Sequence, residues 1–245
     1  MKFTLKCAAV LVLSTAALLA GDLTITMMGK GKYNDGPQTH YWSSKYMRID
    51  NPGSKQDTLV DYVNGVNYTI DHKKKVIQKT SWDDMEVAVE GMAKQFKDMP
   101  PQILAMMPGG GGGGEVSVED QGKEVVAGRT CRKWHITMGK MVMETSNDAS
   151  LKPPVPAVGY TRFLRLKNLM GAIGPAAMNM KKFGEELAKI QGMALKTRTV
   201  MPMIGEMTTE ATAVKEGAIA ESVFALPPDY KMEDVGAKMA KSYRK

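Results

Sequence analysis

Cysteine is scarce in this sequence, and its scarcity restricts the chemistry of the protein. Only two cysteines occur among 245 residues. Cys7 lies in an apolar N-terminal segment that we expect to be removed on export, so Cys131 is the one cysteine of the mature chain. A protein with one cysteine folds without an internal disulfide. Cys131 is therefore either a buried, inert thiol or part of a site.

Short catalytic motifs are also missing. The sequence contains no HExxH, CxxC or GxSxG motif, and no His and acidic residues at the spacing of a metalloenzyme. Cys131 as a nucleophile would need a base and an orienting group, and no sequence pattern places His40 or His72 beside it. We therefore predict that the protein is not an enzyme and uses no cofactor.

No apolar run is long enough to cross a membrane. The longest one, residues 7–20, falls short of the roughly 20 apolar residues that a transmembrane helix needs. It follows the basic start MKFTLK and ends in small residues, which is the arrangement of a secretory signal peptide. The sequence thus predicts a signal peptide over residues 1–20. The mature protein is expected to be exported, to a bacterial periplasm or as a secreted protein, with at most transient membrane contact.

The charge is mildly positive and is not concentrated in one patch. The full chain has a formal net charge of +7, and removal of the signal peptide takes away Lys2 and Lys6. The longest basic run, Lys73 to Lys75, is typical of a solvated hairpin. Because there is no arginine-rich stripe and no interleaving of basic and aromatic residues, we predict that the protein has no nucleic-acid partner.

Most of the remaining chain has the alternating pattern of β-strands. Strands are predicted at residues 23–28, 39–50, 57–63, 66–71, 74–80, 123–127, 130–138, 141–145, 192–203, 206–215 and 220–231. Asn64 and Gly65 join two of them and favour a type I′ turn, in which both residues have positive φ. Because strands and helices do not alternate regularly, the pattern predicts an α+β fold with an antiparallel sheet.

Three segments have the pattern of helices. Ser81 and Asp84 form a capping arrangement at the start of the first one. An apolar stripe follows at Met85, Val89, Met92, Phe96 and Met99. Two prolines after Met99 end this helix. Helices are also predicted at residues 161–170 and 175–191, and six glycines at 109–114 predict a flexible linker.

Three short segments give the chain a family resemblance. They are YVNGVNYTIDHKKK (62–75), EVVAGRTCRKWHI (124–136) and VFALPPDY (223–230). With these segments the chain resembles bacterial exported proteins of unknown function that share the LolA-like lipoprotein-carrier fold. The resemblance implies a single LolA-like domain over residues 21–245. Its fold would be a curved antiparallel sheet, an incomplete β-barrel, whose concave apolar face is covered by helices and admits a hydrophobic molecule.

The space between the helices and the sheet is where we expect the ligand. The side chains predicted to line this space are Met92, Phe96, Trp134, Met180 and Phe183. Binding would bury apolar area of a hydrophobic, lipid-like small molecule. The expected function is therefore that of an exported, non-enzymatic binding protein, and the sequence does not indicate a protein partner.

Copper binding is one alternative. Cys131, His135 and Met138 occur in the order in which a blue-copper loop supplies three of its ligands. If residues 130–138 form a strand, however, Cys131 and His135 face one side, while Trp134 and Met138 face the other. The chain also has 21 methionines, whose thioethers suit Cu(I), but they are spread over the whole sequence and equally suit a core. A Met-rich periplasmic copper-binding protein stays open, as does a structural envelope module with no small ligand.

Overall fold

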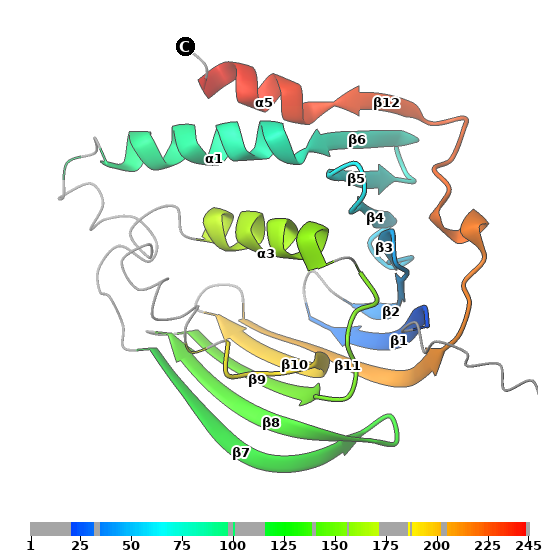
Figure 1. Ribbon diagram of the computed structural model, residues 1–245, viewed down its shortest axis with the longest axis vertical. Coiled ribbons are helices and arrows are strands. Elements are labelled where there is room, and N and C mark those ends of the chain that lie inside the picture. Colours follow the sequence, from blue (N-terminus) through cyan, green and yellow to red (C-terminus); the bar gives the residue numbers. More distant parts are fainter. Residues whose placement is uncertain are drawn as a thin grey trace, which may run out of the picture.

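The described strands join in one large sheet. The computed structural model describes residues 21–31, 35–97, 100, 116–138, 141–155, 157–171, 186, 188–201 and 205–243. Within them lies a 12-stranded sheet with the order β12-β6-β5-β4-β3-β2-β1-β11-β10-β9-β8-β7 (Figure 1). The strands are β1 (Leu23–Lys30), β2 (Gly36–Trp42), β3 (Tyr46–Asp50), β4 (Gln56–Asp61), β5 (Val66–Asp71), β6 (Val76–Ser81), β7 (Val116–Val126), β8 (Arg129–Met138), β9 (Met141–Asp148), β10 (Met193–Met201), β11 (Gly205–Glu216) and β12 (Lys231–Asp234). Neighbouring strands are antiparallel, except β12 and β6, which are parallel.

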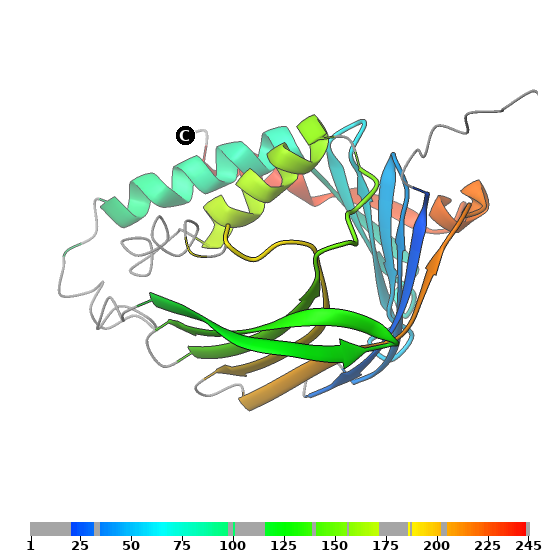
Figure 2. The ribbon, with the colours of Figure 1, turned by 60° about the horizontal axis from the view of Figure 1, so that its bottom comes forward.

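The sheet bends into a trough. Figures 1 and 2 show that the strands from β12 to β2 form one wall of the trough and the strands from β1 to β7 form the other. The helices lie on the inner side of the bend. Helix α1 (Trp82–Lys97) and helix α3 (Ala157–Gly171) lie on this inner side, and helix α5 (Val235–Tyr243) lies beside α1. The prediction of an α+β fold with a curved, open antiparallel sheet and covering helices is therefore confirmed.

The hairpins of the first half share one turn design, repeated every ten residues. Each turn begins with an Asn or Asp side chain that accepts backbone N–H groups, and ends with a left-handed residue. The first residues are Asn51, Asp61 and Asp71, and the left-handed ones are Lys55, Gly65 and Lys75. The predicted type I′ turn is wrong, because Gly65 has a φ of 63° but Asn64 does not have a positive φ. The Asp61 carboxylate instead accepts the N–H of Asn64 at 2.9 Å and so shapes a longer turn.

Helix α1 begins where the sequence predicts. Ser81 Oγ accepts the backbone N–H of Asp84 at 3.1 Å and donates to the Asp84 carboxylate at 2.6 Å, which closes the capping arrangement. The apolar stripe faces the sheet, since Met85 and Val89 are buried and Met92 packs against the same core. The capping residues thus set the start of the helix, and the stripe sets the face that it buries.

Helix α3 is held against the start of α1 by charge pairs. Arg162 Nε lies 3.2 Å from Glu86 Oε1, and Arg165 Nη2 lies 2.7 Å from the same oxygen. Arg162 also pairs with Asp83. The hydrogen bond from Arg162 is the main cause that lowers the pKa of Glu86. The helix predicted at residues 161–170 is confirmed and begins earlier, at Ala157.

The end of the chain differs from the prediction. Residues 220–231 do not form a strand, because Glu221–Phe224 is a 3-10 helix and the two prolines after it have no N–H groups to donate to a sheet. The chain instead crosses the outer face of β3, where Phe224 stacks on Tyr46 at a ring-centroid distance of 5.4 Å. It then adds strand β12 and helix α5, which no sequence pattern predicted.

Several predicted features lie outside the described residues. They are the signal peptide at 1–20, the glycine run at 109–114, most of the helix at 175–191, and Met99 at the end of the first apolar stripe. These features stay predictions.

Candidate functional site

The inner face of the sheet, which is the face turned toward α1 and α3, carries a core beneath the helices. Its buried members are Met47, Val60, Tyr62, Trp82, Met85, Val89 and Leu166, and Trp42, Ile49, Met92, Val155, Tyr160 and Phe163 pack against them. The centroid of the Tyr62 ring lies 5.7 Å from that of Phe163, 6.2 Å from that of Trp82 and 6.4 Å from that of Tyr160. We call these four rings the aromatic cluster. It joins β4 to both helices by burying aromatic area.

In the half from β1 to β7 the inner face is largely apolar and rich in threonine, and it carries one ion pair, Arg132 with Asp120, beside Trp134. Strand register assigns its residues, because directly paired residues of neighbouring strands point to the same face. Starting from Met27 and Gly29 of β1, the inner rows contain Met207, Thr209, Thr197, Thr199, Met143, Thr145, Trp134, Ile136 and Val118. Ile136 is fully buried, and Met143 and Trp134 are half-buried. This surface and the core beneath the helices form one trough, which is the candidate binding site.

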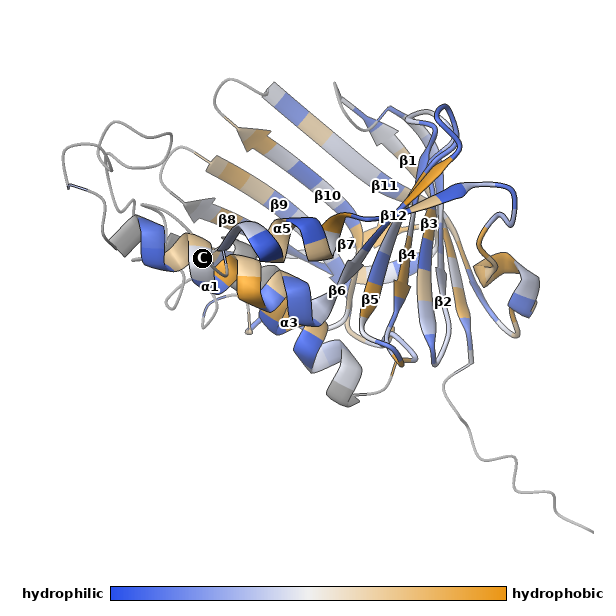
Figure 3. Ribbon diagram, turned by 90° about the horizontal axis from the view of Figure 1, so that it is seen from above, coloured by the Kyte–Doolittle hydropathy of each residue, from blue (hydrophilic) through white to orange (hydrophobic). Residues whose placement is uncertain are grey.

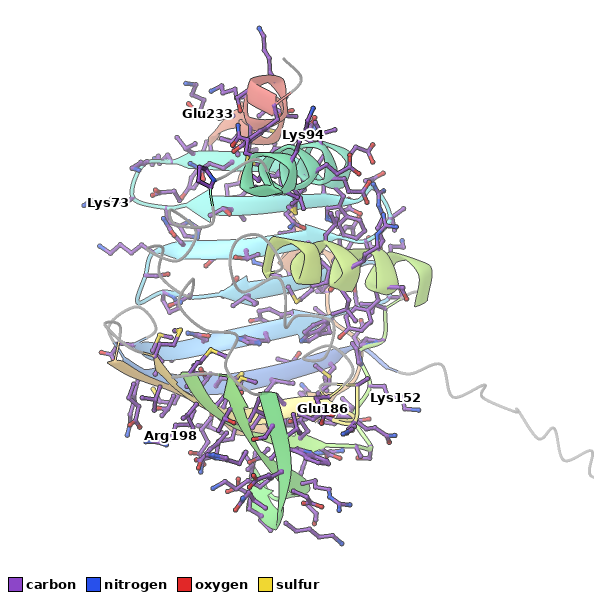
Figure 4. The ribbon with its side chains drawn as sticks, turned by 90° about the vertical axis from the view of Figure 1, so that its left-hand side faces the viewer. Lys73, Lys94, Lys152, Glu186, Arg198 and Glu233 are labelled. Atoms are coloured by element: carbon purple, nitrogen blue, oxygen red, sulfur yellow. The ribbon has the colours of Figure 1, made fainter. Side chains whose placement is uncertain are left out.

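The outer face of the same strands is charged. Lys133 and His135 both contact Glu144, at 3.5 and 3.7 Å, and Arg198 lies 3.9 Å from the same carboxylate. Figure 4 shows Arg198 on the side of these strands that points away from the helices. Figure 3 shows hydrophilic and hydrophobic residues alternating along the strands. The two faces therefore differ in chemistry, and the apolar one faces the trough.

Two of the five predicted lining residues lie in the described part of the trough. Met92 packs against the core beneath the helices, and Trp134 lies on the inner face of β8. Phe96 is part of α1, but its side chain is outside the described residues, as are Met180 and Phe183. A contact of any of these five residues with a ligand stays a prediction.

Trp42, Tyr62 and His40 bring polar groups to the part of the inner face near the helices. The indole Nε1 of Trp42 and the hydroxyl of Tyr62 are buried without a hydrogen-bond partner in the described part of the chain. Burial raises the pKa of Tyr62 well above its ordinary value. His40 Nε2 lies 3.3 Å from Gln38 Oε1, and burial lowers the pKa of His40 to about 4. Sequence reasoning did not single out these groups, although the two-residue spacing of His40 and Trp42 in β2 places them on one face.

His40 makes the stability of the protein depend on pH. The unfolded chain takes up a proton on this histidine near pH 6.5, but the folded chain does so only near pH 4. Acidification between these values therefore favours the unfolded state: the contribution is fully present above pH 6.5 and is lost as the pH falls to 4. We expect a loss of about 2 kcal/mol in the free energy of unfolding over this window, measured by urea denaturation.

The variant His40→Gln is the control for this prediction. It removes the titrating ring but keeps a polar side chain, so the slope of stability against pH should flatten between pH 6.5 and 4. An NMR titration that places the pKa of His40 near its ordinary value in the folded protein would contradict the prediction.

Cys131 is a buried thiol. Its side chain is 1% exposed, and Sγ lies 3.7 Å from the carbonyl oxygen of Arg129. Burial raises the pKa of the thiol, which disfavours the thiolate that a copper ion would need. No group of three His, Cys, Asp or Glu side chains within the described ranges is placed to hold a metal ion, and the side chain of Met138 lies outside them. The alternative of a copper site at Cys131, His135 and Met138 is therefore not supported.

A polar cluster on the outer face holds the C-terminal crossing segment. Arg48 donates to Asp57 at 2.8 Å, and its other amino group donates to the carbonyl oxygens of Val223 at 3.0 Å and Ala225 at 3.1 Å. Arg48 also pairs with Asp50 at 2.5 Å. The side chains of Arg48 and Asp57 are only 13% and 7% exposed. A largely buried ion pair thus fastens the crossing segment to the sheet.

His72 extends this outer cluster. One ring nitrogen lies 2.8 Å from Asp57, and the other lies 3.0 Å from the hydroxyl of Tyr230. Burial alone would raise the pKa of Asp57, but the hydrogen bonds from His72 and from the Asn51 N–H, with the charge of Arg48, lower it. A shallow depression of about 510 Å³ lies beside His72. Because its polar groups already pair with one another, we interpret this cluster as an anchor for the chain.

These observations define the protein as an α+β protein with an open, curved, mostly antiparallel sheet and helices in its trough. No family model matches the chain, and no curated protein matches it in sequence. Among the described helices, none has the length and apolar character that crossing a membrane requires.

Several solved structures resemble this fold at low sequence identity. PNGF-II matches with a TM-score of 0.41 and 13% identity, over 92% of this chain and 34% of that one. A chain of the MucA/MucB complex from Pseudomonas aeruginosa matches with a TM-score of 0.42 and 14% identity, over 88% and 59% of the two chains. A LolA superfamily protein from Nitrosomonas europaea matches with a TM-score of 0.25 and 7% identity, over 84% and 90%. The predicted resemblance to LolA-like proteins is thus confirmed, as a distant likeness of fold that carries no argument about ligands.

Proposed function

We propose that the protein is an exported, non-enzymatic binding protein that holds a hydrophobic, lipid-like molecule in the trough. The observation that supports this proposal best is the contrast between the two faces of strands β8 to β10. Their outer face is covered by ion pairs around Glu144, whereas their inner face presents Trp134, Ile136 and Met143 toward the helices. Apolar area that a ligand buries on such a surface contributes about 25 cal/mol per Å².

Residues from both sides of the trough take part in this proposal. Met92 contributes from α1 and Trp134 from β8. The proposed lining also includes Phe96, Met180 and Phe183, because their spacing in the sequence is that of residues on one face of a helix. The N-terminal segment directs the protein out of the cytoplasm, to the periplasm or beyond it, and contact with a membrane is limited to the moment of ligand transfer.

Native mass spectrometry of the mature protein, purified from the exported compartment, tests the proposal directly. We expect an adduct with the mass of a lipid, which disappears after extraction with organic solvent. The extracted protein should then bind methyl palmitate again. A protein that carries no adduct and binds no added apolar ligand would speak for a structural module instead.

Two neighbouring residues of β9 provide a matched pair of variants. Met143 is paired with Ile136 on the inner face, whereas Val142 is paired with Thr137 on the outer face, and both are half-buried. Met143→Glu places a carboxylate in the trough, so we expect the affinity for methyl palmitate to fall at least tenfold. Val142→Glu should leave the affinity within about twofold of the wild type. Equal losses in the two variants would contradict the assignment of the site to the inner face.

A further inference from the structure

We propose that the ligand is an amphiphile whose head carries a neutral oxygen acceptor, an ester or amide carbonyl, which accepts hydrogen bonds from Tyr62 and Trp42. This inference rests on the proposed function, since it names the class of molecule that the trough takes. It starts from two buried donors of the inner face that have no partner among the described residues.

The buried hydroxyl of Tyr62 gives the stronger support for this inference. Its side chain is 5% exposed, and its ring contacts the other three rings of the aromatic cluster. A hydroxyl withdrawn from water with no acceptor lacks the compensation that nearly every buried polar group has. The hydroxyl of Tyr62, where the sheet meets helix α3, therefore has a donor that no described residue accepts.

Trp42 adds a second donor at the junction of two cores. Its ring packs against the core beneath the helices and also against the core built around Leu23, Ile25 and Leu195. Indole Nε1 can only donate, and here it is buried with no acceptor in the part of the chain that the structure describes. Trp42 also pairs directly with Met47 on the inner face, so its side chain shares the trough with Tyr62. Within the described ranges both donors lack an acceptor, so an acceptor on the ligand would satisfy them.

The surroundings favour a neutral acceptor over a carboxylate. The core beneath the helices is built from apolar and aromatic side chains, and a carboxylate buried among them needs a cation to compensate its charge. Arg162 lies over the Trp82 ring, at 5.6 Å from its centroid, but it already pairs with Asp83 and Glu86. A carbonyl oxygen accepts from two donors without bringing a charge.

Binding of three ligands of similar chain length tests this inference. Methyl palmitate, hexadecane and palmitate are offered to the extracted protein from cyclodextrin complexes, and their dissociation constants are measured by calorimetry. We expect wild-type protein to bind the ester at least tenfold more tightly than hexadecane and than palmitate. Tyr62→Phe should lose most of the preference for the ester while it keeps the affinity for hexadecane, and Trp42→Phe should do the same.

A second measurement uses the ligand-free protein. Because the Tyr62 hydroxyl has no hydrogen-bond partner among the described residues, the melting temperature of Tyr62→Phe should equal or exceed that of the wild type. Tyr230→Phe is the matched control: its hydroxyl lies 3.0 Å from His72, so this variant should melt at a lower temperature. A clear drop in the melting temperature of Tyr62→Phe would overturn the inference, since it would reveal a partner within the protein.

The outcomes separate this inference from the proposed function. If ester and hexadecane bind equally well, or if palmitate binds best, the trough takes apolar ligands but the neutral acceptor is wrong. If Tyr62→Phe and Trp42→Phe keep the preference for the ester, the donors are assigned wrongly. If none of the three ligands binds the wild-type protein, the proposed function fails, and this inference fails with it.

Discussion

Replacing Trp82 by alanine is expected to lower the free energy of unfolding by about 4 kcal/mol. Trp82 is 1% exposed, donates from Nε1 to Asn67 at 3.0 Å and packs against Tyr62 and Phe163. Its truncation removes buried aromatic area, leaves a cavity and takes away the surface on which Arg162 rests. We therefore expect helices α1 and α3 to pack less firmly on the sheet, in addition to the loss of stability. Urea denaturation followed by far-UV circular dichroism measures the loss.

Trp134→Ala is the control for this effect. Trp134 is half-buried on the inner face of β8 and is not a member of the core beneath the helices. We expect its truncation to cost about 1 kcal/mol, because less buried area is lost and the Arg132 guanidinium that lies over its ring, at 5.5 Å from the centroid, is exposed. If Trp82→Ala and Trp134→Ala lowered stability equally, the aromatic cluster would not be the contact that docks the helices.

Replacing Arg48 by methionine is expected to cost about 3 kcal/mol. The variant leaves the carboxylates of Asp50 and Asp57 together without their cation, and the Asp57 side chain is only 7% exposed. It also removes both hydrogen bonds to the crossing segment, at Val223 and Ala225. We expect faster limited proteolysis between residues 217 and 230, as well as the drop in the free energy of unfolding. The protein without its anchor should open first at this segment.

An exposed arginine pair gives the comparison. Arg132 pairs with Asp120, but its side chain is 57% exposed, so solvent screens the interaction. Arg132→Met should change the free energy of unfolding by less than about 1 kcal/mol. A loss of stability in Arg48→Met no larger than that in Arg132→Met would show that the crossing segment holds by packing alone.

The parts of the fold that local patterns predict are those whose causes are local. The start of α1 depends on Ser81 and Asp84, which are three residues apart, and the strands of the first half depend on alternation within each strand. The turns escaped the prediction, although the period of ten from Asn51 to Asp61 to Asp71 is visible in the sequence. Strand β12 and helix α5 were missed because they are short, and because their place depends on contacts with β6 and α1.

The candidate site also has features that local sequence patterns predict and features that they do not. Alternation along residues 130–138 predicts that Trp134 and Cys131 face opposite sides of the sheet. The pairing of β8 with β7 and β9 agrees with this alternation. That Tyr62 and Trp42 have no hydrogen-bond partner among the described residues does not follow from any local pattern, because it depends on which side chains of α3 and the neighbouring strands surround them. The outer anchor at Arg48 escaped for the same reason, since its partners are 175 and 177 residues away in the chain.

The pairing of β1 with β11 has a consequence for the order of folding. Leu23 pairs with Glu216, so nearly the whole chain separates two neighbouring strands of the sheet. The hairpins from β2 to β6 close short loops and can form while the rest of the chain is still being made. Strand β1 keeps one unpaired edge until β11 has been synthesised, and this late, long-range closure slows the final step. Because β11 pairs with β1 and β12 pairs with β6, the sheet is complete only after the C-terminal strands have been made.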